Sequence, residues 1–142
     1  MRLLQCVGRP NLIGYDALRV YGSPSYHTIK LFATHVADEI LKARATDTDV
    51  LVSVTRDRRS CTLYVKLVNP GSAAATVQLD ITGAALRPSA TALTLAGDPQ
   101  DTNSIDAPER VVPKTSQVTG VKSGFTYTVP ANGIVVLELG LR

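Results

Sequence analysis

Residues 62–82, TLYVKLVNPGSAAATVQLDIT, constrain the fold more than any other stretch, because apolar and polar residues alternate on both sides of a turn signal. Alternation with a period of two is typical of half-buried β-strands, whose successive side chains point to opposite faces. Asn69-Pro70-Gly71-Ser72 separates the two runs, and proline and glycine both favour a turn. The stretch therefore predicts a central β-hairpin with one apolar face that another layer must cover.

Similar alternation recurs in the C-terminal two thirds of the chain, at 50–55, 91–95, 125–129 and 134–141. The last of these segments is apolar on both faces, which predicts a strand that is central or covered on both sides. Residues 97–113 are rich in proline and acidic residues and are predicted to form a long loop. Six or more short strands at this spacing indicate a mainly β protein, an antiparallel β-sandwich or jelly roll.

The N-terminal part follows a helical period instead. After Gly22, Ser23 or Ser25 can cap a helix and Pro24 fits its first turn. Apolar residues then recur in steps of three and four, which predicts one amphipathic helix over about 26–43; they are Ile29, Phe32, Val36 and Ile40. Residues 1–44 are therefore predicted to carry the helix, and residues 45–142 to form the sandwich domain after a polar linker.

Charge and hydropathy exclude several partners. The net charge of the 142 residues is +3, and the basic side chains cluster only at Arg56, Arg58 and Arg59, in a predicted turn, so no nucleic acid is expected. The chain lacks an apolar run of about 18 residues, so no membrane-spanning helix is expected. Residues 1–7 are too short for a signal peptide, which predicts a cytoplasmic location. Cys6 and Cys61 leave a disulfide open, although Cys61 is predicted to begin a strand as a small core residue.

Few residues fall in sequence patterns typical of catalytic or metal-binding sites. Ser25, His27, His35 and Asp38 are the best catalytic candidates, but GSPSYH lacks the G-x-S-x-G elbow and capping explains its serines. His27 and His35 lie about 12 Å apart along a helix, too far to share a metal ion. The acidic residues of the 97–113 loop are predicted to form solvated Asx turns, with a calcium site as the alternative. We expect no catalytic residue, metal site or cofactor.

Two segments carry a family resemblance. NLIGYDALRVYGSPSYHTIKLFATHVADEIL resembles the end of the catalytic barrel in α-L-arabinofuranosidases of glycoside hydrolase family 51. LAGDPQDTNSIDAPERVVP and FTYTVPANGIVVLELGL resemble the C-terminal β-sandwich of that family, whereas residues 1–10 do not resemble it. The resemblance implies that residues 1–44 are the remnant of a barrel end with its last helix. It also implies that Asn103 folds its loop back through side-chain hydrogen bonds, and that Pro108 stiffens the loop.

No residue of this chain matches the catalytic glutamates of that family, which lie on earlier barrel strands. The first hypothesis is therefore a non-catalytic C-terminal accessory domain of an α-L-arabinofuranosidase-like glycoside hydrolase. Its helix would either fold back over the sandwich or be buried between copies in a homo-oligomer. The second hypothesis is a carbohydrate-binding module for plant polysaccharide, with Tyr64 as the best exposed aromatic candidate. The third is a small stand-alone hydrolase, an esterase or glycosidase, with a site formed at an interface from Ser25, His27, His35 and an acid such as Asp38.

Overall fold

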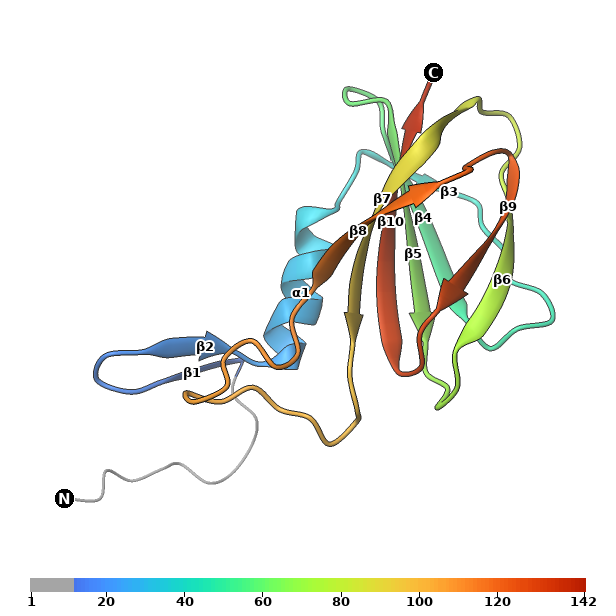
Figure 1. Ribbon diagram of the computed structural model, residues 1–142. Coiled ribbons are helices and arrows are strands. Elements are labelled where there is room, and N and C mark those ends of the chain that lie inside the picture. Colours follow the sequence, from blue (N-terminus) through green and yellow to red (C-terminus); the bar gives the residue numbers. More distant parts are fainter. Residues whose placement is uncertain (1–11) are drawn as a thin grey trace.

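The computed structural model describes residues 12–142 and is mainly β, as predicted (Figure 1). This part of the chain contains one α-helix and ten strands. In chain order the elements are β1 (Ile13–Tyr15), β2 (Val20–Gly22), α1 (Pro24–Thr34), β3 (Glu39–Leu41), β4 (Leu51–Asp57), β5 (Thr62–Asn69), β6 (Ala75–Asp80), β7 (Leu86–Ala96), β8 (Lys114–Thr119), β9 (Gly124–Val129) and β10 (Gly133–Leu141).

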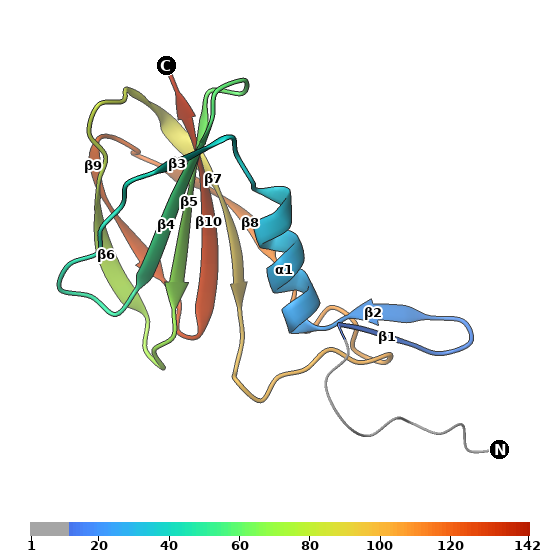
Figure 2. The same ribbon diagram turned by 180° about the vertical axis from the view of Figure 1, so that it is seen from behind.

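Two antiparallel layers form the sandwich (Figures 1 and 2). The larger sheet has the order β3-β4-β5-β10-β7-β8, and the smaller sheet pairs β6 with β9. Alternate residues of β5 and β10 point inward and pack against Val77 of β6 and Phe125 and Val129 of β9. Leu67 and Leu137 are at most 1% exposed at the centre of this core. The predicted antiparallel sandwich is therefore confirmed.

The predicted central hairpin is wrong, because its two strands lie in different sheets. Strand β5 pairs with β4 and β10, whereas β6 pairs with β9. The turn residues instead carry the chain from one layer to the other. The Asn69 side chain is 4% exposed and donates to the carbonyl oxygens of Ala73, Val129 and Pro130, which ties this crossing to the β9–β10 turn. Alternation shows which face of a strand is buried, but it does not specify which strand pairs with it.

Strand β10 is central, as its apolar residues on both faces predicted. It lies between β5 and β7, and Val135, Leu137 and Leu139 face the inner core. On the outer face Val136 is fully buried in a second cluster with Leu31 of α1, Leu95 and Val111. The helix thus folds back over the sandwich, which was one of the two outcomes expected for its apolar face.

The helix begins as predicted but ends nine residues early. Ser23 caps it by accepting a hydrogen bond from the backbone of Tyr26 at 3.2 Å, and Pro24 occupies its first turn. Beyond Thr34 the apolar residues Val36 and Ile40 are 68% and 83% exposed, so they do not continue a buried face. Residues 39–41 extend the larger sheet as β3, with Ile40 opposite Thr55. Backbone pairing with the open edge of β4 therefore prevails over the helical spacing.

Several local predictions need correction or stay open. Cys61 is exposed with a φ of 51° in the turn before β5, and not a core residue, while Cys6 lies outside the described residues. Strand β8 was missed because its sequence, KTSQVT, is polar and largely exposed at a sheet edge. The boundary predicted between residues 44 and 45 stays a prediction. No helix within residues 12–142 has the length and hydropathy needed to cross a bilayer.

Candidate functional site

Three of the four catalytic candidates are placed in separate surroundings. Ser25 is exposed on the first turn of α1, and Asp38 accepts a hydrogen bond from the backbone of Arg58. His27 is half-buried, with its ring edge-on to Tyr26 at 5.3 Å. Burial and the neighbouring Lys30 ammonium hold the pKa of His27 below its usual value, although the backbone of Gly22 opposes them. Asp38 contacts the backbone of Arg58 and His27 contacts Tyr26, so these contacts do not join the candidates into a Ser–His–Asp arrangement.

His35, the fourth candidate, links the end of the helix to the sheet. It is the C-cap residue of α1 and is 9% exposed. Its Nδ1 lies 2.6 Å from the carbonyl oxygen of Leu31, and its Nε2 lies 3.2 Å from Oε1 of Glu138 on β10. The ring also packs edge-on against Tyr64 of β5, with centroids 5.5 Å apart. These contacts give His35 a structural role, in which it joins the end of the helix to the larger sheet.

Tyr64 does not stand on an open surface as expected, because His35 covers part of it and leaves it half-buried. It forms one end of a polar row that sequence reasoning missed. Across the sheet Tyr64 is the register partner of Glu138, Glu138 is that of Thr91, and Thr91 is that of Gln117. Each residue is polar in its own strand, but only the registers of β5, β10, β7 and β8 place them in one line.

The row crosses a hollow on the outer face of the larger sheet, which we call the outer trough. The trough has a volume of about 400 Å³ and is lined largely by polar side chains, namely Ser60, Thr62, Tyr64, Arg87, Ser89, Thr91, Gln117 and Glu138, together with Ala90 and Gly140. The amide of Gln117 donates to the hydroxyl of Thr91 at 3.4 Å, so neighbours in the row already interact. The outer trough offers a set of hydrogen-bond donors and acceptors.

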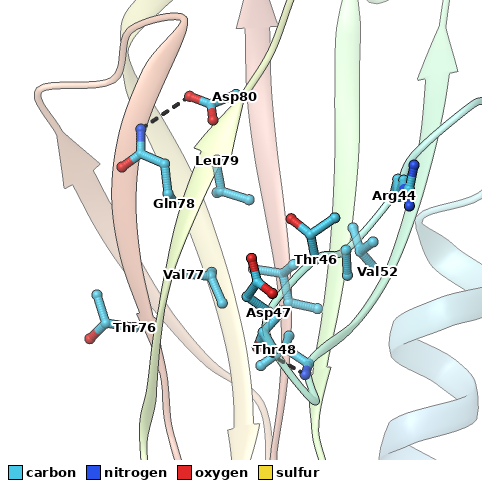
Figure 3. A pocket seen from close by; sticks show the side chains of 13 residues that line it. Arg44, Thr46, Asp47, Thr48, Val52, Thr76, Val77, Gln78, Leu79 and Asp80 are labelled. Atoms are coloured by element: carbon cyan, nitrogen blue, oxygen red, sulfur yellow. Dashed lines mark hydrogen bonds between the residues drawn. The ribbon is translucent and has the colours of Figure 1, made fainter.

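A second hollow, the inter-sheet groove, lies between residues 44–48 and β6 (Figure 3). It has a volume of about 410 Å³ and continues into a hollow of about 510 Å³ that shares Arg44, Val52 and residues 78–80 with it. Figure 3 shows Val77 and Leu79 on the side of β6 that faces residues 44–48, and Thr76 on the other side. The floor is therefore formed by apolar core residues, at the margin where a sheet of two strands faces a sheet of six.

The 97–113 loop is structured by its own polar side chains, as predicted. Asp98 forms an Asx turn by accepting a hydrogen bond from the backbone of Gln100, and Asp101 pairs with Arg110. Asn103 is 4% exposed, donates to the carbonyl oxygens of Gly22 and Val111, and accepts from the backbone N–H of Val111. The described residues hold no group of three or more His, Cys, Asp or Glu side chains placed for a metal ion.

Comparisons with known proteins agree on one family. Residues 2–132 match the family described as "Alpha-L-arabinofuranosidase C-terminal domain". The match begins at residue 2, so the expectation that residues 1–10 differ from the family was wrong. The chain is 43% identical over 90 residues to an extracellular exo-α-L-arabinofuranosidase of Streptomyces chartreusis, covering 63% of this chain and 11% of that protein.

Solved structures of α-L-arabinofuranosidases show the same fold. The arabinose-bound α-L-arabinofuranosidase MgGH51 superposes on 96% of this chain with a TM-score of 0.88 and 30% identity, and the chain covers 22% of that protein. The arabinose complex of the Thermotoga maritima α-L-arabinofuranosidase superposes on 90% of the chain with a TM-score of 0.80 at 18% identity, and the chain covers 31% of it. The chain therefore spans a minor part of the length of these relatives. Sequence and fold agree, and the chain belongs to the family of α-L-arabinofuranosidase C-terminal domains.

Proposed function

We propose that this chain is a non-catalytic accessory domain of an α-L-arabinofuranosidase-like glycoside hydrolase, with a role in association. The observation that carries the proposal is the apolar surface of the β1–β2 hairpin. Tyr15 and Leu18 are 81% and 94% exposed there, and Leu12, Ile13 and Val20 are exposed as well. We call these five residues the hairpin surface. A soluble domain that exposes several large apolar side chains together gains free energy by covering them.

The position of the hairpin supports a docking role. The two strands pair only with each other among the described residues and extend away from the sandwich at the N-terminal end of α1 (Figures 1 and 2). A two-stranded hairpin is at best marginally stable by itself in water. The Asp16 carboxylate accepts hydrogen bonds from the backbones of Leu18 and Arg19 and so holds the turn. A preformed apolar ribbon of this kind suits a protein partner.

For the separate 142-residue chain, we propose that the partner is a second copy. The sequence predicted a homo-oligomer with its contact surface on the helix. We now place that contact surface on the hairpin, because Leu31 of the helix is already buried against the sheet. Light scattering coupled to size exclusion, over a range of concentrations, tests this proposal. The full chain should give a dimer or larger species, and the variant with Tyr15→Ser and Leu18→Ser should be monomeric.

A matched control comes from an edge strand of the larger sheet. Ile40 of β3 is 83% exposed but lies outside the hairpin surface, so Ile40→Ser should leave the association unchanged. A wild-type chain that stays monomeric at every concentration contradicts the proposed homo-oligomer. Equal loss of association in the Ile40→Ser variant contradicts the role of the hairpin.

Catalysis is tested separately, with nitrophenyl arabinofuranoside and nitrophenyl acetate as substrates. We expect the purified chain to hydrolyse neither, because Asp38 contacts Arg58 and His27 contacts Tyr26, and neither contact joins the candidate residues to one another. Turnover that disappears in His27→Ala would instead support the stand-alone hydrolase.

The compartment is a further part of the proposal. The sequence predicts a cytoplasmic location, while the Streptomyces chartreusis relative is an extracellular enzyme. Immunodetection after separation of cells from culture medium tests this prediction. Recovery of the protein from the medium contradicts the cytoplasmic location.

A further inference from the structure

The polar row of the outer trough has a regular geometry. Tyr64, Glu138, Thr91 and Gln117 come from four adjacent strands of the larger sheet, and each is the register partner of the next. Neighbouring strands lie about 4.8 Å apart, so four strands span about 14 Å from the first residue of the row to the last. The row therefore presents hydrogen-bonding groups at even intervals over the length of a short chain molecule.

The walls of the trough are held in place by contacts within the protein. At one end Tyr64 packs edge-on against His35, whose Nε2 also lies 3.2 Å from Glu138. Beside the row, the Arg87 side chain packs over Gly140. A Cβ atom at position 140 would lie only 2.8 Å from Arg87 Cδ, so glycine leaves the space that the arginine side chain occupies. Arg87 donates from Nε to the carbonyl oxygen of Leu141 at 3.2 Å. A ligand would meet side chains whose positions are largely set before it binds, which lowers the entropic cost of binding.

The chemistry of the lining matches a neutral polyhydroxylated ligand. Hydroxyl groups of a sugar both donate and accept hydrogen bonds, and the trough offers both roles through hydroxyls, an amide and a carboxylate. Glu138 and Arg87 are its two charged side chains and have opposite signs, so the trough favours neither anions nor cations. The Tyr64 ring adds an apolar surface for the C–H groups of a sugar. We propose that the outer trough binds a neutral oligosaccharide along the row from Tyr64 to Gln117.

This inference goes beyond the accessory role and is independent of it. The hairpin surface adjoins the N-terminal end of α1, whereas the trough begins at its C-cap, where His35 meets Glu138. A partner on the hairpin therefore leaves the trough open. Saccharide binding should persist in the Tyr15→Ser, Leu18→Ser variant, so failure of the association and failure of the binding can be told apart.

Isothermal titration calorimetry of the full chain tests the proposal, with arabinohexaose and xylohexaose as neutral probes and hexagalacturonate as an acidic probe. At least one neutral probe should give saturable binding, and hexagalacturonate should bind more weakly. Gln117→Ala should weaken binding about fivefold, the value expected when one hydrogen bond of about 1 kcal/mol is lost. Gln117 is exposed, so this change should leave the fold intact, as circular dichroism would verify.

The matched control is Gln78→Ala, which removes the same side chain from β6, on the other sheet. Binding should be unchanged in this variant. Three calorimetric outcomes overturn the proposal: no saturable binding of either neutral probe, tighter binding of hexagalacturonate, or equal weakening by Gln78→Ala and Gln117→Ala. Backbone amide shifts in NMR titrations should map to β5, β10, β7 and β8, and shifts confined to the inter-sheet groove would likewise overturn it.

Discussion

His35 Nε2 lies 3.2 Å from Oε1 of Glu138, while Nδ1 of the same ring lies 2.6 Å from the backbone oxygen of Leu31. Carbonyl and carboxylate oxygens accept hydrogen bonds, so each ring nitrogen of His35 faces one acceptor. One side chain thereby joins the C-terminal turn of the helix to the central strand. This contact helps to explain why the helix ends here and packs on the sheet.

The first prediction concerns that pair. His35→Ala and Glu138→Gln should each destabilise the chain, and the double variant should lose less than the sum of the two. We expect a coupling free energy of about 1 kcal/mol, the value typical of one hydrogen bond, since Glu138 is partly exposed. Urea unfolding of the wild type and the three variants measures it. Strict additivity would show that the two side chains act independently.

The second prediction concerns Asn103, whose side chain makes one part-buried hydrogen bond to the backbone of Gly22 and two buried ones to the backbone of Val111. Asn103→Ala should destabilise the fold by about 2–4 kcal/mol, because the backbone groups of Val111 are left buried without these partners. Urea unfolding measures the loss. Asn132→Ala, at a half-buried turn position with a φ of 47°, serves as the comparison and should cost less. Equal losses would contradict the special role of Asn103.

The third prediction concerns packing of the helix. Leu31 is 3% exposed against the sheet, and Ile29 on the same helix is 55% exposed. Leu31→Ala should destabilise the chain by about 2–5 kcal/mol through lost burial and the cavity left behind. Ile29→Ala should change stability by less than about 1 kcal/mol. Hydrogen exchange over Pro24–Thr34 should accelerate only in the Leu31 variant if the helix is held by this contact.

The fourth prediction concerns acid stability. Hydrogen bonds from Arg58 and then Arg56 hold the pKa of Glu39 below its usual value, which favours the folded state when the carboxylate is charged. This stabilisation is present above the usual glutamate pKa of about 4.3 and is lost as the pH falls through the lower folded value. Glu39→Gln should therefore reduce Tm at neutral pH, and the difference from wild type should shrink in acid.

A thermal melt series from neutral pH to pH about 3 measures this difference across the range where carboxylates titrate. Glu109→Gln is the control, because it removes a carboxylate from the exposed 97–113 loop, away from Arg56 and Arg58. The control should leave the shape of the profile unchanged. A Glu39→Gln profile parallel to wild type at every pH would contradict the assigned role of the two arginines.

Local sequence patterns were sufficient to predict much of this structure. Alternation predicted the buried faces of β5, β6 and β9, and the apolar residues on both faces of β10 predicted its central position. The helix start at Ser23 and Pro24 could be predicted because a cap depends on neighbours within one turn. The role of Asn103 followed from the family resemblance, and the structure confirms its side-chain bonds.

Strand neighbours, the end of the helix and the outer trough were decided by the tertiary structure. Alternation is the same whether β5 pairs with β6 or with β10, because it records only which side chains are buried. Residues 36–43 keep a helical spacing, but the open edge of β4 and the His35 contact with Glu138 favour another path. The row from Tyr64 to Gln117 joins residues that are far apart in the chain, and only the register of four strands aligns them. The sequence by itself therefore determined which local faces are buried, and long-range pairing decided which of those faces meet.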